Sequence, residues 1–567
     1  MRPFPHAFAR REPRRCGRFT RQTPSRGQPG AELSQPDLDE SPQNPHGRVA
    51  SWHRVVFSAV ILTVVATGAG SAADASESAD PDAKEATQPN VLFMISDDLN
   101  CRIGCYGDPD VLTPNLDRLA ARGVRFENAY CQFPLCGPSR NSMLCGLYPD
   151  STGILANSQI FRETIPSHQS LPHAFRLGGY FSARIGKLYH YNVPRSVGTN
   201  GHDDPASWEM EINPMGCDRS VEEPDIFSLK KGSYGGTLSW YASPRPDGQH
   251  TDALLAEEAD WVLERCSKRN DRPFFLAVGF YRPHTPYVAP EKYFRHYQLD
   301  EMPLAENVDE DLRDVPPASL LSHKKEHELL NDPLRRQAIQ AYYASITFMD
   351  AQVGKVLDSL ERHGLADNTI IVFTSDHGYH LGAKGLWQKR SLFEESARVP
   401  LIISTPQGRS QGKVATAPVG LIDLYPTLAD LCQVDAPENL QGQSLRPMLD
   451  DVTHAGRGYT ISQVTRKWGK QKSLFFGYTI RTQQYRLTLW DDAKQGVELY
   501  DHRADPAERN NLAYDESAPD SKTQNQEILS TIESLTRLLH DEIARGMPDD
   551  GRPAPKPRKW VIDLTNP

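Results

Sequence analysis

The sequence contains few cysteines, no long basic stripe in its body and no apolar run long enough to span a membrane comfortably. A membrane-spanning helix needs about 20 apolar residues, and the most apolar segment, residues 55–66, is shorter. The formal net charge of −10 argues against a nucleic-acid binder, because neutralising phosphates requires a basic face. With 38% hydrophobic and 24% charged residues, the 567-residue chain has an ordinary globular composition, and we expect one large and one smaller folded unit.

The nine cysteines are too sparse for a scaffold held together by disulfides. The sequence has no Cys-x-x-Cys pair, and Cys131, Cys136 and Cys145 lack the spacing of zinc ligands. We therefore do not expect structural zinc, and the sequence leaves the pairing of individual cysteines open.

The first 88 residues have the pattern of an export leader. Residues 2–26 are rich in Arg and Pro and lack hydrophobic periodicity, which is typical of a disordered segment. The apolar run 55–66 and the small residues up to Ala73 follow, in the order of a secretory signal peptide. We interpret residues 1–73 as leader and signal peptide and residues 74–88 as a flexible tether. We therefore predict a periplasmic or secreted protein with no stable membrane span after signal cleavage.

The rest of the chain alternates buried strands with amphipathic helices, which predicts an α/β fold with a large, mainly parallel sheet sandwiched by helices. The strands are expected at residues 90–96, 180–186, 274–280 and 369–375, and the helices at residues 113–123, 171–177, 336–362 and 421–431. We assign this large domain to residues 89–450. A smaller C-terminal α+β subdomain is assigned to residues 451–567, with strands at residues 474–480, 485–490 and 497–499 and a helix at residues 526–545.

Two of the predicted strands end in acidic groups, Asp97-Asp98 and Asp376-His377. Either pair alone is most simply a solvated turn. Adjacent carboxylates repel one another unless a cation lies between them, and the carboxyl ends of strands are where open α/β sheets bind ligands. Together the pairs therefore indicate a site for a hard cation such as calcium or magnesium.

Further polar residues lie near the ends of predicted strands or in loops: Lys187, His190, His284 and Lys389. Single Lys and His residues are usually surface residues, so each is only a weak indication of function. Cys136 precedes a predicted helix at residues 139–146, and helix N-termini favour anions. From residue chemistry alone, a buried thiol or a disulfide to Cys131 or Cys145 is an equally good interpretation of Cys136.

The segment Pro134-Leu135-Cys136-Gly137-Pro138-Ser139-Arg140, followed by Met143-Leu144 and Gly146, resembles the C-x-P-S-R signature of type I sulfatases in the alkaline phosphatase-like superfamily. The resemblance implies that a formylglycine-generating or other sulfatase-maturing enzyme oxidises Cys136 to formylglycine, whose hydrate supplies the attacking hydroxyl. Cys145 departs from the pattern, because the family usually has Thr or Ala there, and this difference bears on recognition by the maturing enzyme.

The same resemblance covers nearly everything after Pro89. It implies a metal site formed by Asp97, Asp98, Asp376 and His377 together with residue 136. The His at position 377, with Gly-Lys-x-x-His and Pro-His-x-Pro, looks most like the iduronate-2-sulfatase branch. Calcium is the implied metal and magnesium the second choice, although imidazole is not a favoured ligand of calcium.

The resemblance also implies roles for the basic residues of the site. Arg140 would hold the hydrate, Lys187 would bind the sulfate, and His190 would remove a proton from the second hydroxyl. His284 and Lys389 are both candidates for protonating the leaving oxygen. A sulfated polysaccharide or its oligosaccharides is the expected substrate, and an aryl or choline ester is the alternative. Residues 193–250 have no readable pattern that would identify the sugar.

Two other functions are compatible with these residues. A phosphodiester or phosphonate monoester hydrolase of the same superfamily would use a similar metal arrangement. A catalytically silent, glycan-binding protein would keep the fold without the chemistry. Desulfation that depends on Cys136 separates the silent protein from a sulfatase, and relative rates on sulfate and phosphonate esters separate the two enzymes.

Overall fold

The computed structural model describes residues 88–269, 271–406, 408–468, 473–517 and 522–546. The predicted leader and signal peptide, residues 1–73, and all but the last residue of the predicted tether lie outside this part of the chain. Within the described residues, no helix combines the length and the hydropathy that crossing a bilayer requires.

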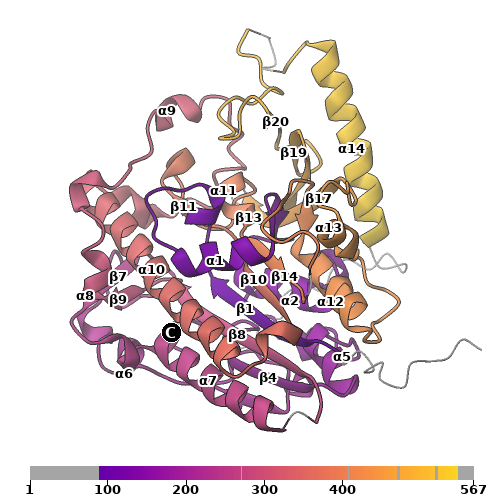
Figure 1. The fold of residues 1–567 in the computed structure, drawn as a ribbon. Helices are drawn as coiled ribbons and strands as arrows, with labels where there is room; N and C mark the ends of the chain where they lie inside the picture. The colour runs from indigo at the N-terminus through magenta and orange to yellow at the C-terminus, as the bar shows by residue number, and fades with distance from the viewer. Residues whose placement is uncertain (1–87, 270, 407, 469–472, 518–521, 547–567) are drawn as a thin grey trace, which may run out of the picture. The chain divides into compact units, whose positions relative to one another are not determined.

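An eight-stranded sheet forms the centre of the fold, in the order β15-β2-β14-β10-β1-β8-β4-β5 (Figure 1). Strands β10, β1, β8, β4 and β5 run parallel to one another, whereas β14 is antiparallel to both of its neighbours. The prediction of a mainly parallel sheet is therefore confirmed. The bounds are β1 (Asn90–Asp97), β2 (Val124–Phe126), β4 (Phe181–Gly186), β5 (Met210–Ile212), β8 (Phe274–Pro283), β10 (Thr369–Ser375), β14 (Leu401–Ser404) and β15 (Val414–Ala415).

Helices cover both faces of this sheet, which explains why its central strands β1 and β10 are buried at every position and carry long apolar runs. Successive side chains of a strand point to opposite faces. In β1, Leu92 and Met94 join the core formed with α1 (Pro114–Arg122), α7 (Thr251–Arg269) and α10 (Asp332–Arg362). The alternate residues Val91, Phe93 and Ile95 join the core on the other face, formed with α2 (Cys136–Cys145), α5 (Leu171–Leu177) and α12 (Leu424–Cys432).

The C-terminal part contains a four-stranded antiparallel sheet against which α14 (Gln526–Gly546) packs. Three of its strands were predicted from sequence, and their bounds are β18 (Ser473–Thr482), β19 (Tyr485–Trp490) and β20 (Gly496–Asp501). The fourth, β17 (Tyr459–Trp468), was not predicted. Its polar residues Ser462 and Gln463 are buried, where they donate hydrogen bonds to the Cys131 carbonyl and to Asp150, so the strand lacks a clear alternation of apolar and polar residues.

The segment between residues 193 and 250, which had no readable pattern, consists of short elements. They include β5, α6 (Cys217–Ser220), β6 (Phe227–Ser228) and β7 (Ser239–Ser243). Strand β7 lies between β6 and β9 (Tyr287–Pro290) in a small second sheet. Elements this short carry too few residues for a period to be recognised in the sequence.

The strand register brings the carboxyl ends of four strands together. Ser96 of β1 lies opposite Ser375 of β10, so the acidic groups that follow these two residues are neighbours. On the other side of β1, Asp97 lies opposite Pro283 of β8, and β8 pairs in turn with β4, which ends at Gly186. Side chains that lie far apart in the sequence therefore meet at one edge of the sheet.

Candidate active site

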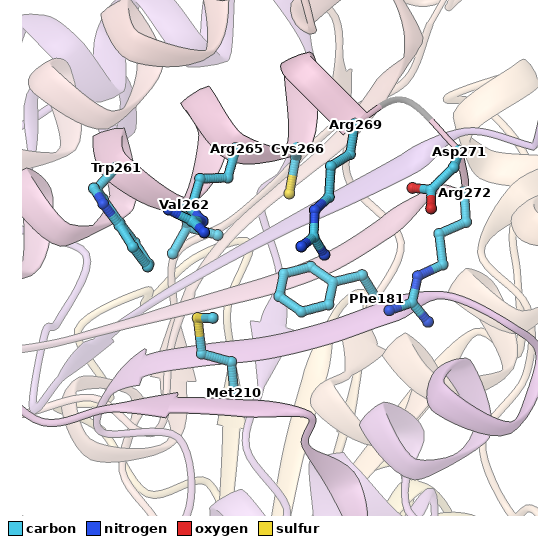
Figure 2. A pocket seen from close by; sticks show the side chains of 9 residues that line it. All are labelled: Phe181, Met210, Trp261, Val262, Arg265, Cys266, Arg269, Asp271 and Arg272. Carbon is cyan, nitrogen blue, oxygen red and sulfur yellow. The ribbon is translucent and has the colours of Figure 1, made fainter.

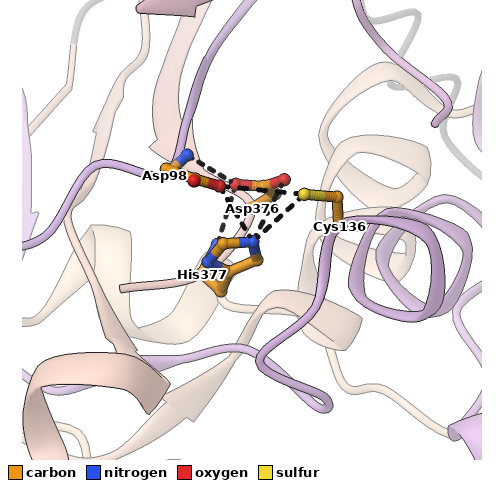
Figure 3. A group of neighbouring side chains, drawn as sticks. All are labelled: Asp98, Cys136, Asp376 and His377. Atoms are coloured by element: carbon orange, nitrogen blue, oxygen red, sulfur yellow. Dashed lines mark hydrogen bonds and ion pairs between the residues drawn. The ribbon is translucent and has the colours of Figure 1, made fainter. Parts of the chain in front are cut away.

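Cys136 is the first residue of α2, a helix whose ten residues are all buried. Leu135 precedes the helix in extended conformation, so the helix begins three residues earlier than the sequence indicated. Residues four apart lie on the same face of a helix, which places Arg140 one turn beyond Cys136. The Cys136 side chain points toward the ends of β1 and β10 (Figure 3). The helix therefore presents the sulfur and the guanidinium to the same acidic cluster.

The ligand atoms of Asp98, Cys136, Asp376 and His377 all lie within 4.8 Å of one another, and all four residues are buried. The His377 Nε2 atom is 3.3 Å from the Cys136 sulfur, 3.2 Å from Asp98 Oδ1 and 3.6 Å from Asp376 Oδ2. The other ring nitrogen, Nδ1, lies 2.9 Å from the Gly378 carbonyl oxygen, to which only a protonated nitrogen can donate. In a neutral ring, Nε2 therefore faces the carboxylates with a lone pair.

This arrangement fits a divalent cation better than it fits the side chains alone. A lone pair on His377 Nε2 repels the carboxylate oxygens next to it unless a cation lies between them. Asp98 Oδ2 is a further buried oxygen without a hydrogen-bond partner. Asp97 and His284 border the same place, with ligand atoms within 4.8 Å of one another and of Asp98. The donor set of three carboxylates and one imidazole can hold a metal ion.

Asp98 adopts a left-handed backbone conformation, with φ at 67°. Residues other than glycine rarely occupy this region, and such strain is concentrated at functional sites. Two hydrogen bonds hold it here: the Asp98 amide donates to Asp376 Oδ1 at 3.0 Å, and the Asp98 carbonyl accepts from the Tyr342 hydroxyl at 2.8 Å. The strain directs the Asp98 carboxylate toward Cys136 and His377.

Arg140 holds the carboxylates of Asp97 and Asp376 in position. Its side chain is fully buried and contacts Asp376 Oδ2 at 2.8 Å through Nε and Asp97 Oδ1 at 3.1 Å through Nη2. Nη1 donates to the carbonyl oxygens of Lys187 and Leu188, at 2.8 and 3.0 Å. Burial tends to raise the pKa of Asp376, but the charges of Arg140, His377 and Lys187 outweigh it and hold that pKa well below its ordinary value.

Two lysines supply the remaining positive charge. Lys187 Nζ lies 2.6 Å from Asp97 Oδ2, and Lys389 Nζ lies 2.5 Å from Asp98 Oδ1 and 3.1 Å from the Cys136 sulfur. The residues on either side of Lys389, Gln388 and Arg390, both have left-handed φ values, of 70° and 77°. The backbone strain around Lys389 is therefore of the same kind as that at Asp98.

The charges of the site cancel without a metal. Asp97, Asp98 and Asp376 carry three negative charges, and Arg140, Lys187 and Lys389 carry three positive charges. An anionic substrate needs a surplus of positive charge, which a divalent cation would provide. A surplus of positive charge at the site therefore requires the metal in addition to these three basic residues.

The thiol of Cys136 is poorly suited to act as a nucleophile. Burial raises its pKa well above the ordinary value, and the nearby charges of Lys389 and Lys187 do not offset that effect. Only the thiolate is an effective nucleophile. The eight described cysteines are all free, so Cys136 is not paired with Cys131 or Cys145.

The two histidines expected at the site lie at its border and are buried. His284 Nε2 is 3.8 Å from Asp98 Oδ2, and its Nδ1 is 2.6 Å from the Thr285 carbonyl oxygen. His190 has no hydrogen-bond partner on either ring nitrogen. Burial is the largest cause that holds the pKa of both imidazoles well below the ordinary value, and Lys187 and Lys389 act in the same direction, whereas Asp98 opposes it in His284. The charges that lower the pKa of His190 are mainly those of Lys187, His202 and Lys389. His190 is therefore close enough to the two active-site lysines to be affected by their charge.

Sequence reasoning missed two cations near the site, Lys324 and Arg390. Lys324 Nζ donates to Gln388 Oε1, next to Lys389, and to the Gly236 carbonyl oxygen. Burial and the charges of Lys389 and Arg390 lower its pKa to about 8, against a smaller opposing effect of Glu326. In the described part of the chain, neither Lys324 nor Arg390 forms a salt bridge with a carboxylate. Lys324 follows no predicted strand, so no local pattern distinguishes it.

A separate pocket lies at the other end of β4 (Figure 2). Phe181 and Met210, the first residues of β4 and β5, form its floor, and the C-terminal half of α7 forms its wall. Lys187 follows the opposite end of β4. None of the predicted site residues lines this pocket, so it is not part of the acidic and basic cluster.

The chain is similar in sequence to known proteins over most of its length. Residues 89–434 match the family model described as Sulfatase, and residues 382–535 match the model described as N-sulphoglucosamine sulphohydrolase, C-terminal. A sulfatase of Formosa agariphila is 35% identical over 470 residues, which cover 80% of this chain and 87% of that protein. The iduronate 2-sulfatase of Mus musculus is 30% identical over 514 residues, covering 77% of this chain and 90% of that protein.

The fold is also similar to that of solved structures. A phosphonate monoester hydrolase of Agrobacterium radiobacter superimposes with a TM-score of 0.65 at 21% sequence identity, covering 81% of this chain and 96% of that chain. At this level of identity the likeness concerns the fold. It confirms the predicted class, a large sheet between helices with a smaller C-terminal unit.

Proposed function

Because the chain belongs to the sulfatase family, a family of sulfuric ester hydrolases, we propose that it hydrolyses sulfate monoesters on sulfated carbohydrates through a modified Cys136 and a bound calcium ion. One observation carries the proposal. Cys136 is the first residue of a buried helix, and its sulfur lies 3.1 to 3.7 Å from polar atoms of Asp98, His377 and Lys389. A residue at this position can attack an ester that the surrounding cations hold.

The nucleophile of this proposal is the hydrate of formylglycine. A sulfatase-maturing enzyme would oxidise the Cβ of Cys136 by two electrons to an aldehyde, supply the oxidant and release the sulfur as sulfide. Addition of water then provides two hydroxyls on the same carbon. The proposal is supported by the C-x-P-S-R signature and by the raised pKa of the unmodified thiol, which argues against direct attack by sulfur.

Asp97, Asp98, Asp376 and His377 are the proposed ligands of the calcium ion, together with residue 136. When bound, the ion would supply positive charge that polarises the ester and favours the ionised hydroxyl. Arg140 contacts two of these carboxylates, at 2.8 and 3.1 Å, and is proposed to keep them in place for the ion. Magnesium is the less favoured choice, because the mixed, crowded ligand set does not suit its strict octahedral geometry.

The remaining residues divide the proton transfers and the binding of charge. One hydroxyl of residue 136 attacks sulfur, and the bond from sulfur to the leaving oxygen breaks. His284 is the proposed donor of a proton to that oxygen: burial holds its pKa low, Asp98 opposes that effect, and the bound anionic ester would raise the pKa further. Lys187 and Lys389 bind the sulfate oxygens. His190, with two unpartnered ring nitrogens, then removes the proton of the second hydroxyl, so that the aldehyde re-forms and sulfate leaves.

A sulfated polysaccharide or oligosaccharide is the proposed substrate. The name of one relative, iduronate 2-sulfatase, indicates that this relative acts on a sulfated sugar. Lys324 and Arg390 support an anionic carbohydrate as substrate. Both lie near Lys389 without a carboxylate partner and can bind further sulfate or carboxylate groups of the carbohydrate.

We also propose that the protein is exported, as the signal-like residues 52–73 indicate. Residues 89–450 and 451–567 are the proposed catalytic domain and C-terminal subdomain.

A phosphonate monoester hydrolase is the second candidate, supported by the fold likeness to such an enzyme. The two candidates differ in the charge and geometry of the ester, so the ratio of kcat/KM for an aryl sulfate to that for an aryl phosphonate monoester separates them. We expect the sulfate to be the better substrate.

The decisive experiment uses protein produced with and without a sulfatase-maturing enzyme. With it, the peptide covering residues 126–140 should have the mass of an aldehyde, and the protein should release sulfate from a sulfated oligosaccharide. The Cys136→Ala variant should release none. Release by the unsubstituted protein together with its loss in this variant would exclude a silent glycan-binding protein. Full activity in protein that carries an unmodified thiol at position 136 would overturn the proposed nucleophile.

A further inference from the structure

A second cluster of metal-ligand side chains lies outside the active site, in the segment between β5 and α7. The ligand atoms of Cys217, Glu222 and His250 lie within 4.8 Å of one another, and all three side chains are buried. Cys217 begins α6, Glu222 follows it, and His250 immediately precedes α7. No residue of the active site belongs to this cluster.

Two atoms of the cluster lack hydrogen-bond partners and face each other. His250 is 1% exposed and Glu222 is 2% exposed, yet neither His250 Nε2 nor Glu222 Oε2 has a hydrogen-bond partner in the described structure. They lie 3.8 Å apart, which is too long for a direct hydrogen bond. Leaving two buried polar atoms without a partner is unfavourable, because neither regains the hydrogen bonds that it makes to water in the unfolded chain.

The other atoms of the same side chains are fully engaged, which orients the two free atoms. His250 Nδ1 lies 3.1 Å from the Pro246 carbonyl oxygen, so this nitrogen carries a proton and, in a neutral ring, Nε2 offers a lone pair. Glu222 Oε1 accepts from the Ser243 hydroxyl at 2.5 Å and from Arg245 Nε at 3.3 Å, whereas Oε2 is left toward His250. Outer hydrogen bonds of this kind are the usual support of metal ligands.

We propose that Cys217, Glu222 and His250 bind a structural zinc ion. Thiolate, imidazole and carboxylate together suit zinc or a similar transition metal and do not suit calcium, which prefers oxygen. Three protein ligands leave the fourth tetrahedral position to a water molecule. Because the ligands join α6 to the start of α7 and none of them belongs to the active site, we assign the ion a structural role. This site departs from the expectation drawn from the sequence, because its ligands are spread over 34 residues and follow no zinc-binding pattern.

The cluster is connected to the active site through Asp218. The Asp218 carboxylate accepts from the Thr251 amide at 2.8 Å and pairs with Arg282, two residues before His284. Zinc would therefore fasten α6 to the start of α7 and support the loop that carries His284. We expect zinc to raise the thermal stability of the protein, since a ligand that binds the folded state stabilises it by mass action.

The test uses full-length mature protein with a Cys136→Ala substitution, which removes the active-site thiol, and with excess Ca²⁺ to occupy the oxygen-rich site. We expect one equivalent of Zn²⁺ per chain by elemental analysis, and a sulfur-to-metal charge-transfer band when Co²⁺ replaces it. Adding Cys217→Ala should abolish the band. The matched control Cys266→Ala, which removes a partly buried cysteine in α7, should retain it.

A second variant distinguishes loss of zinc binding from loss of the fold. Glu222→Gln keeps the shape of the side chain and its hydrogen bond from Ser243 but removes the charge, and it should weaken Zn²⁺ binding by about tenfold or more. Absence of the band in the parent protein, or its persistence in the Cys217→Ala variant, would overturn the proposal. Because Zn²⁺ binding is measured in a protein without the catalytic residue, its outcome does not depend on the proposed sulfatase reaction.

Discussion

The ammonium nitrogen of Lys389 lies 3.1 Å from the Cys136 sulfur and 2.5 Å from Asp98 Oδ1. One cation thus contacts both the residue proposed as nucleophile and a proposed metal ligand. Burial acts to lower the pKa of Lys389, but Asp98, Cys136 and Asp97 outweigh it, so that this pKa is raised and the side chain stays charged. Lys389 is therefore better suited to bind an anionic oxygen than to release a proton.

Replacing Lys389 with Ala should lower kcat/KM for a sulfated oligosaccharide by about 10²–10³-fold, the effect of removing one preorganised donor. Lys389→Arg keeps the charge and should retain more activity, although its planar group fits the strained segment less well. Steady-state kinetics of the two variants provide the measurement. Equal losses in both variants would show that geometry, and not charge, is what matters at this position.

His284 is predicted to matter most for poor leaving groups. His284→Gln should slow hydrolysis of a sugar sulfate by about 10²–10⁴-fold, because an alkoxide needs a proton to leave. Hydrolysis of 4-nitrophenyl sulfate should be slowed much less, because nitrophenolate leaves without one. The exposed neighbour His296, replaced with Gln, is the control. A similar loss on both substrates would contradict the role of His284 as the acid.

His190 is predicted to act after the ester bond is broken. In a His190→Gln variant, the first turnover should release alcohol in a burst of about one equivalent, followed by a slow steady state. The burst is expected because sulfate is no longer released efficiently from the sulfated residue 136. Rapid mixing with 4-nitrophenyl sulfate measures the burst, and the mass of the peptide covering residues 126–140 identifies the sulfated form. A variant that shows neither burst nor sulfated peptide would assign His190 to an earlier step.

Lys324 should make substrate binding depend on pH. Its pKa is lowered to about 8 by burial and nearby cations, so it is charged below this pH and neutral above it. We expect KM for a multiply anionic oligosaccharide to rise as pH increases through 8, with little change for 4-nitrophenyl sulfate. Lys324→Met should raise KM already at pH 7, and Lys324→Arg should remove the increase above pH 8. Lys325→Met, which alters an exposed neighbour, should leave the profile unchanged.

Calcium removal should inactivate the enzyme without unfolding it. The six charged side chains of the site balance, so the surplus charge that binds the ester would come from the proposed metal. A calcium-selective chelator should abolish sulfate release, and added Ca²⁺ should restore it better than Mg²⁺. Far-ultraviolet circular dichroism recorded alongside would show the fold intact. Unchanged activity in protein shown to be free of metal would refute the proposed metal site.

The sequence made most of the fold predictable, and it identified the acidic groups that the fold brings to one edge of the sheet. Strands β1 and β10 have nearly continuous apolar runs because both faces are covered, and this pattern is local enough to be recognised. The acidic groups that follow these strands could be assigned to a common edge because parallel strands have aligned carboxyl ends. Strand β17 could not be predicted, since its buried polar residues find partners only in the folded protein.

By itself, the sequence determined the chemistry of the site: a Cys136 with Pro138 and Arg140 nearby, acidic strand ends and several basic residues. Only the tertiary structure decided which of these residues meet and which others join them. Lys324 lies near Lys389, and Cys217 and Glu222 lie near His250, through contacts between segments distant in the chain. A side chain's local pattern reflects its own helix or strand, whereas its neighbours depend on how those elements pack, and no period in the sequence records that packing.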